Sequence, residues 1–298
     1  MSDALSATRD RVFVGIVFVS FAYFFFTVHD AAVKILVVAI PVWQILFFRS
    51  VTILAGCGLS FGRNVYGDAW RSPVFRPMLF RSFLIFASWL CFYTAARDLQ
   101  LAELTTIYFA APIIVTVLSV LILKEKVPLS RWLAVVIGFV GVYFACNPAS
   151  LGFSRPVLLV LTAAFGWGLA IVLMRKIALQ EKSVVQMVLN NGFFLITAGV
   201  PSLFMWQMPS WWQAMLLVVT GAVAGFAQFT LYEGMKRAPA SVIAPFEYTS
   251  LVWAFVLGYA LWSDVPRPEV VVGAVLIVGA GLLTIVGEHR RQKRFEKI

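Results

Sequence analysis

Charged residues are scarce in this sequence. Asp, Glu, Lys and Arg make up 13% of its 298 residues, whereas hydrophobic residues make up 61%. An ordinary soluble domain has about 25% charged and about 45–50% apolar residues. Folding cannot hide this much apolar surface behind so few charges, because even a large domain leaves about a quarter of its surface exposed. The composition therefore excludes a water-soluble enzyme and predicts a membrane protein.

Histidine and cysteine are also few. The two histidines, His29 and His289, lie near opposite ends of the chain, and the three cysteines lie inside apolar runs, where a thiol behaves as a small hydrophobe. This spacing indicates neither a disulfide framework nor a metal site. The sequence also lacks a phosphate-binding loop and the motifs GxSxG and HExxH. We therefore expect no catalytic residue, no metal and no cofactor.

Long apolar runs are abundant. A helix that crosses the membrane needs about 20 mostly apolar residues, and ten runs of about this length are bounded by charges, proline or tryptophan. The sequence thus predicts an all-α polytopic membrane protein with ten transmembrane helices. They are expected at 12–38, 40–61, 77–97, 101–123, 131–147, 156–176, 184–205, 211–235, 239–262 and 270–287. A loop near 62–76 and a basic tail at 288–298 are the main segments outside them.

The net charge of +10 is informative through its placement. If the N-terminus is cytoplasmic, most of the 24 Lys and Arg residues fall on the cytoplasmic side, as the positive-inside rule requires. We therefore predict a multi-pass protein of the cell (inner) membrane with both termini in the cytoplasm. Anionic lipid headgroups are the expected partners of the basic residues, and Arg81 is expected to snorkel to them. No solvated basic module is left for nucleic acid.

The sequence aligns with itself at an offset of about 138 to 142 residues. The stretch 102–128 matches 240–266 without a gap, and both end in a Val-Pro turn. Gln44 also pairs with Gln186, and Tyr93 with Tyr232. The preserved order predicts two five-helix repeats, 12–147 and 156–287. Because five is odd, the second repeat enters the membrane from the opposite side, an arrangement that recurs in secondary transporters.

The turns LKEKVP (123–128) and WSDVP (262–266) each follow a long apolar helix and precede a Gly-spaced one. In this the chain resembles EamA-type transporters of the drug/metabolite transporter superfamily. The family pattern has Gly-Glu at both turns, whereas this sequence has Lys124-Glu125 and Trp262-Ser263. The resemblance implies a transporter that holds its substrate near the membrane midplane between the repeats.

Within that superfamily, three features resemble the branch with riboflavin and S-adenosylmethionine transporters. They are Asp30-x-x-x-Lys34, Arg49 and the string Pro245-Phe246-Glu247-Tyr248. The branch of aromatic amino-acid exporters is more distant, because the first helix lacks its Trp-Ser-Thr-like start. The resemblance implies a riboflavin-like or nucleoside-like vitamin or cofactor as substrate, with export of aromatic amino acids as the alternative.

Charged residues inside the membrane are costly and need a partner or a water-lined cavity. Asp30 and Arg49 lie at similar depths on either side of the turn at 39–41, so they can face each other. Lys34 lies one helical turn from Asp30 and could join them. This group is either a structural staple of the hairpin or a functional anion clamp or gate. Glu247 has no evident cation partner in sequence, which suits proton coupling or substrate binding; a protonated, hydrogen-bonded carboxyl is the alternative.

Amides and mid-membrane aromatic residues complete the group of candidates. Such tryptophans either pack in the core or stack on a flat, partly polar ligand. The candidates for substrate binding or coupling are Asp30, Lys34, Arg49, Trp89, Tyr93, Trp167, Asn190, Asn191, Gln228, Glu247, Tyr248 and Trp253. Glycines such as Gly141 and Gly273 are expected to allow close helix packing, and Pro112 and Pro245 to bend their helices.

Three functions thus remain open. The first is a secondary transporter for a small organic molecule, as a monomer or homodimer with protons as one candidate for the coupling ion. The second is an integral-membrane enzyme, which the missing motifs disfavour. The third is a channel or a scaffold that does not transport.

Overall fold

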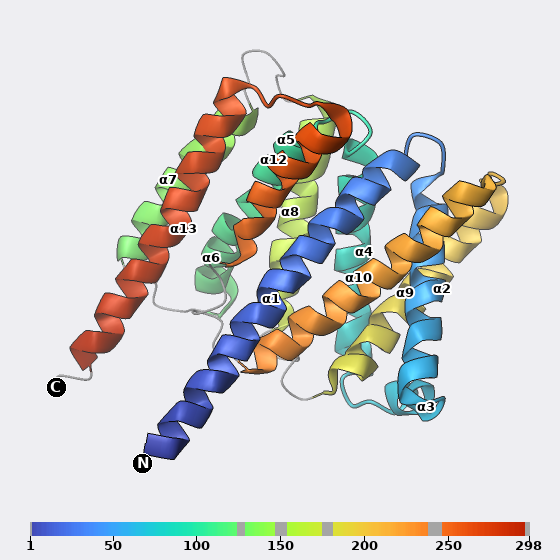
Figure 1. Cartoon of the computed structure of the whole chain (residues 1–298), viewed down its shortest axis with the longest axis horizontal. Coiled ribbons are helices and arrows are strands. Elements are labelled where there is room, and N and C mark those ends of the chain that lie inside the picture. The colour runs from blue at the N-terminus through green and yellow to red at the C-terminus, as the bar shows by residue number, and fades with distance from the viewer. Residues whose placement is uncertain (1, 124–128, 147–153, 175–180, 238–245, 296–298) are drawn as a thin grey trace.

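The computed structural model describes residues 2–123, 129–146, 154–174, 181–237 and 246–295. All regular secondary structure in these ranges is helical. The helices are α1 (Ser2–Leu36), α2 (Val42–Phe61), α3 (Asn64–Trp70), α4 (Phe75–Ala95), α5 (Leu101–Tyr108), α6 (Ala110–Leu123), α7 (Leu129–Cys146), α8 (Arg155–Met174), α9 (Ser183–Phe204), α10 (Trp211–Arg237), α12 (Thr249–Trp262) and α13 (Pro268–Phe295). They form one bundle, with both chain ends at the same end of it (Figure 1).

Each of the ten predicted spans contains at least one helix. Seven stretches in the described ranges are long and apolar enough to cross a membrane, and α7, α12 and α13 contain shorter apolar segments. Helices satisfy their own backbone hydrogen bonds, which is what an apolar bilayer demands of a chain that enters it. The protein is therefore a multi-span helical membrane protein.

One local prediction was wrong. The segment 62–76 is not only a loop, because α3 lies within it. The first apolar span, Phe13–Leu36, agrees with the predicted 12–38, although α1 itself begins at Ser2, and α13 continues to Phe295 through most of the basic tail. Polar and charged residues near a chain end can prolong a helix beyond its apolar part, since helix propensity does not require burial.

The predicted span 101–123 is broken at Phe109 into α5 and α6. Pro112 explains the break, because it has no N–H to donate to the carbonyl of Tyr108 four residues earlier, and its ring clashes with that carbonyl. The interruption lies three residues before Pro112, the expected bending point. Pro245, the other expected bending point, lies outside the described residues.

The principal contacts join helices of the first half of the chain to helices of the second half. The most extensive pairs are α1 with α10, α7 with α13, α4 with α8, and α2 with α9, while α5 packs on α12. Helices α7 and α13 lie side by side at one edge of the bundle (Figure 1). Neither half therefore has a separate core.

Small residues bring α7 and α13 together, as the sequence predicts. A Cβ atom on Gly273 would lie 2.5 Å from the carbonyl oxygen of Gly141, and one on Gly141 would lie 2.8 Å from that of Gly273. The two backbones thus approach more closely than any side chain would allow. Gly279, on the same helix α13, has nothing within 4 Å of the corresponding position.

We expect Gly273→Ala to lower the melting temperature in detergent, because the added methyl group must push α7 and α13 apart. Overpacking of this kind costs about 1–3 kcal/mol. Gly279→Ala is the matched control and should leave the melting temperature unchanged or raise it slightly, since alanine favours the helix. Equal melting temperatures for the two variants would contradict this account of the interface.

Candidate functional site

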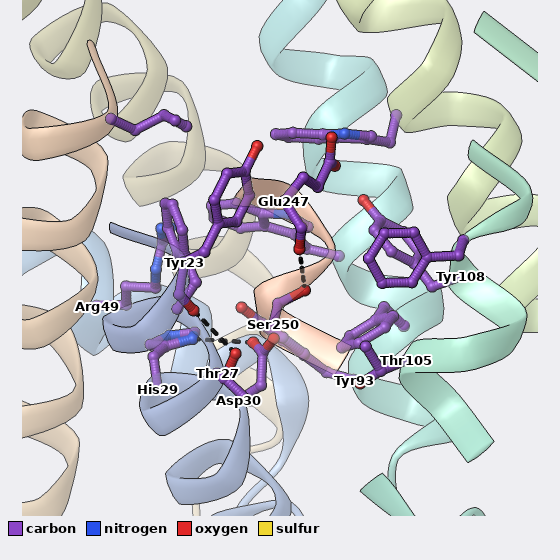
Figure 2. A pocket seen from close by; sticks show the side chains of 16 residues that line it. Tyr23, Thr27, His29, Asp30, Arg49, Tyr93, Thr105, Tyr108, Glu247 and Ser250 are labelled. Atoms are coloured by element: carbon purple, nitrogen blue, oxygen red, sulfur yellow. Dashed lines mark hydrogen bonds and ion pairs between the residues drawn. The ribbon is translucent and has the colours of Figure 1, made fainter. Parts of the chain in front are cut away.

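A cavity of about 130 Å³ lies between α1, α2, α4, α5, α8, α10 and α12, with Phe109 and Glu247 completing its wall. Its walls combine aromatic rings with ionisable groups. The lining residues are Tyr23, Phe26, Thr27, His29, Asp30, Arg49, Trp89, Phe92, Tyr93, Thr105, Tyr108, Phe109, Trp167, Leu231, Glu247 and Ser250. In the view of Figure 2, Arg49 and Tyr108 lie on opposite sides, with Glu247 and Asp30 between them. Both halves of the chain contribute to this cavity.

Arg49 of α2 is the largest fully buried side chain among the described residues, with 1% of its surface exposed. The carbon at the centre of its guanidinium group lies 3.8 Å from the centroid of the Trp89 ring on α4, a cation–π contact. None of its three guanidinium nitrogens has a hydrogen-bond partner among the described residues. The guanidinium group is therefore positioned by an aromatic face while its donors remain available to a ligand.

The predicted network of Asp30, Lys34 and Arg49 is not formed. The carboxylate of Asp30 lies 3.1 Å from Nδ1 of His29, and no ion pair among the described residues joins it to Arg49. Lys34 donates a hydrogen bond to the carbonyl of Leu99, and its ammonium group lies 5.3 Å from the centroid of Trp262. Although Lys34 is one turn from Asp30, its long side chain extends to the end of the bundle and away from the cavity.

Glu247 lies at the cavity just before α12, as its depth in the sequence suggests. Its carboxylate forms no ion pair or hydrogen bond within the part of the chain that the structure describes. Its backbone carbonyl accepts a hydrogen bond of 2.7 Å from Ser250 (Figure 2). Two carboxyl groups and one guanidinium group thus face the same small space.

A second cavity of about 40 Å³ adjoins the first and shares Phe26, Trp89, Trp167 and Leu231 with it. Its other lining residues include Arg81, Asn190, Gln228 and Tyr232.

The expectation that Arg81 snorkels to headgroups was wrong, because Arg81 is only 2% exposed. It lies six residues, or about 9 Å, inside α4, and the face that carries it packs against the bundle rather than lipid. Asn191, a further candidate, is not among the residues that line either cavity, but it contacts Gln228 of the second one. It donates to Gln228, whose Nε2 in turn donates to the hydroxyl of Tyr232 at 3.1 Å.

Two aromatic candidates do not line either cavity. The ring of Tyr248 stacks on Phe109 with centroids 5.2 Å apart, and Trp253 packs edge-on against Phe24 at 4.9 Å. Trp89, Tyr93 and Trp167 do line the first cavity. Mid-membrane depth therefore did not distinguish residues of the cavity wall from residues in other helix contacts, and Trp253 is exposed on 36% of its surface.

Several lining residues did not stand out from the sequence. Tyr23, Phe26 and Asp30 share one face of α1 at positions i, i+3 and i+7, a spacing that could have been read from the position of Asp30. Thr105 and Tyr108 lie just before the break in α5, where the expected Pro112 bend was the available signal. A bend exposes side chains that a straight helix would pack.

At the end of the bundle opposite the chain termini, an ion pair joins the two halves. Nε of Arg267, which precedes α13, lies 2.8 Å from Oε1 of Glu103 in the first turn of α5. The side chain of Glu103 is 8% exposed and that of Arg267 30%. This contact spans 164 residues of sequence and holds α5 to the connection between α12 and α13.

The sequence model of the EamA-like transporter family matches this chain twice, at residues 13–146 and 154–286. The chain belongs to the EamA-like transporter family. The resemblance seen at its Val-Pro turns is thereby confirmed, and the protein is a membrane transporter for a small molecule.

Proteins similar to this chain are named for different substrates. An "S-adenosylmethionine uptake transporter" of Rickettsia prowazekii is 26% identical over 273 residues, 89% of this chain and 90% of its own. A "riboflavin transporter" of Vibrio cholerae is 26% identical over 76% of this chain and 77% of its own. A "pseudopaline exporter" of Pseudomonas aeruginosa is 27% identical over 89% of this chain and 94% of its own. Family membership alone therefore leaves the substrate open.

A solved crystal structure shares the fold. It covers 96% of this chain and 98% of its own with a TM-score of 0.62, at 18% identity. This likeness concerns the arrangement of the helices along nearly the whole chain.

Proposed function

We propose that this protein is a secondary transporter that moves a nucleoside-like or riboflavin-like metabolite by alternating access. The observation that carries the proposal is the cavity that both halves of the chain line with aromatic rings, two carboxyl groups and one guanidinium group. Transport needs a site that either side of the membrane can reach in turn, and a space between two halves can open toward either side. We propose no enzymatic reaction.

The charges in the cavity favour a substrate that itself carries charges of both signs. When a substrate fills the cavity, it removes water from Asp30, Arg49 and Glu247, and uncompensated charges are expensive to desolvate. A substrate with a cationic group and a carboxylate offsets that cost, whereas a neutral flavin does not. S-adenosylmethionine has this chemistry, and transporters named for it are among the relatives. It is therefore our first candidate, and riboflavin is the second.

The aromatic walls fit the remaining part of such a substrate. Trp89, Trp167 and Phe92 present ring faces or edges to the cavity, and a purine or flavin ring can stack on them. Zwitterionic amino acids would also match the charges, but aliphatic ones would leave the rings unused. Aromatic amino acids, our third candidate class, would use both.

We further propose that residues 12–147 and 156–287 form two inverted five-helix repeats across the inner membrane, with both termini and the basic segment 288–298 cytoplasmic. In order along the two repeats, α1, α2, α4 and α7 correspond to α8, α9, α10 and α13. When each helix is replaced by its counterpart, the contact of α1 with α10 becomes the contact of α8 with α4. The contacts of α2 with α9 and of α7 with α13 are each replaced by themselves. In the ungapped alignment the break at Phe109 corresponds to Glu247. Both residues line the cavity. These relations support a two-fold pseudosymmetry, in a protein that we propose acts as a monomer or homodimer.

Alternating access is supported by the size of the cavity and by the ion pair beyond it. A volume of about 130 Å³ is below the roughly 300–1,000 Å³ of most small-molecule sites. A nucleoside-like or riboflavin-like metabolite therefore fits only if the helices around the cavity move apart. The pair of Glu103 and Arg267 joins the two halves at one end. We propose that it closes that end and breaks when the cavity opens there.

Uptake by the purified protein in proteoliposomes tests the function. We expect saturable uptake of labelled S-adenosylmethionine that is accelerated when the liposomes contain the unlabelled compound, because a carrier exchanges substrate through one site. Riboflavin and amino acids are tested alongside. Chemical conversion without net translocation would indicate an enzyme, and non-saturable flux would indicate a channel. Either result contradicts the proposal, as does the absence of flux for every compound.

Glu247→Gln tests proton coupling. The amide keeps the shape of the side chain but cannot release a proton, so we expect uptake driven by a pH gradient to fall by about tenfold or more while exchange at equal pH persists. Glu269→Gln, at the start of α13 and outside the cavity, is the control. If Glu247→Gln retains gradient-driven uptake at the wild-type rate, the carboxyl group does not couple transport to protons.

Cysteines at positions 103 and 267 test the gate, in a variant whose three native cysteines are replaced by alanine. A short thiol-specific cross-linker between Glu103→Cys and Arg267→Cys should abolish uptake, because the halves can no longer separate at that end. Each single-cysteine variant treated with the same reagent is the control. Full uptake by cross-linked protein would exclude opening at this end.

A further inference from the structure

The described residues that line the second cavity carry positive charge but no negative charge. Among the described residues, Arg81 is the only charged one that lines this cavity, whereas the adjoining cavity contains two carboxyl groups as well as Arg49. Its remaining polar groups are the amides of Asn190 and Gln228 and the hydroxyl of Tyr232. The other lining residues are apolar or aromatic, so a guanidinium group with amide and hydroxyl neighbours and no carboxylate among the described lining residues has chemistry that suits an anion.

Arg81 has no partner that would explain its burial as structural. It is 2% exposed, and its Nε and Nη1 atoms are buried without a hydrogen-bond partner in the part of the chain that the structure describes. Asn190 lines the same cavity, and its side-chain NH2 group can donate to an anion. A buried guanidinium group without a counter-charge is costly, so its presence in the bundle calls for an anion that is bound for part of the time.

Trp89 and Trp167 line both cavities, and Trp89 also contacts Arg49. Arg81 lies about 9 Å into α4 from the end of the bundle that holds α3 and the chain termini (Figure 1). Arg49 lies seven residues, or about 10 Å, into α2 from the opposite end. The two guanidinium groups therefore occupy different depths, and the indole ring of Trp89 lines both cavities.

We propose that Arg81 and Asn190 form a second anion subsite, which receives the carboxylate of the substrate from Arg49 as the substrate passes Trp89. Arg49 forms the first subsite and holds the carboxylate when the binding site is open toward the end of the bundle nearest Arg49. The second subsite holds the carboxylate when the binding site is open toward the end nearest Arg81. This inference deepens the proposed function and rests on it, because it assigns a carboxylate to the transported molecule.

The test compares S-adenosylmethionine with its decarboxylated analogue, which keeps the nucleoside and the sulfonium cation. We expect the wild type to bind the parent compound about tenfold or more tightly, the ratio that corresponds to about 1.4 kcal/mol. In Arg81→Met the affinity for the parent compound falls by about the same factor, and the preference over the analogue shrinks. Arg81→Lys, which retains the charge but loses the planar fork, is expected to lie in between.

Two further measurements and a control variant separate a subsite from a structural role. In vesicles of opposite orientation, Arg81→Met should raise the half-saturating concentration more at the face nearest α3, and Arg49→Met more at the other face. The ligand-free melting temperature of Arg81→Met should equal or exceed that of the wild type, because an apolar side chain removes an unpaired buried charge. Arg76→Met, an exposed position of α4, is the matched control and should behave as wild type.

The outcomes are distinguishable. If Arg81→Met retains wild-type affinity and preference for the carboxylate, the subsite is refuted while the transporter function stands. The subsite is also refuted if a lipid phosphate binds Arg81, because the substrate preference would then not change. It is refuted as well if riboflavin is transported and no compound with a carboxylate is. If the wild type transports none of the compounds, the proposed function itself fails.

Discussion

The contact between the guanidinium group of Arg49 and the indole ring of Trp89 is the interaction around which the cavity is arranged. A cation in the apolar interior of a membrane protein must be compensated, and here an aromatic face provides part of that compensation at 3.8 Å. Because no described carboxylate pairs with it, Arg49 keeps its hydrogen-bond donors directed at the cavity. Trp89 thereby becomes the shared wall of two cavities, and its position determines which helices can line them.

The halves of the chain are stabilised chiefly by each other. Helix α7 packs on α13 through Gly141 and Gly273, and α1, α2 and α4 each pack on helices of the second half. The interface between the halves is therefore also the place where the cavities lie. A transporter that alternates between two states needs such an interface to repack without losing its cohesion, and close backbone approach between α7 and α13 provides a contact that need not change.

Depth along a helix was predictable, whereas direction around the helix axis was not. Asp30, Arg49, Trp89 and Glu247 were expected at depths inside the membrane, and all four line the cavity. Lys34 and Arg81 were assigned by the same reasoning to an ion network and to lipid headgroups, and both assignments were wrong. In a soluble protein the apolar face of a helix marks the core, but in a membrane both the core and the lipid-facing surface are apolar.

The amino-acid sequence alone was sufficient for the helical class, the positions of the apolar segments, the duplication and a disturbance of the helix near Pro112. These properties depend on the length of apolar runs, on local backbone chemistry and on internal repetition, all of which can be read along the sequence. The pairing of α1 with α10, the separation of Lys34 from Asp30 and the burial of Arg81 beside Asn190 emerged only in three dimensions. These features depend on which of the apolar helices pack against each other, and that is set by the shapes of the side chains at their contacts.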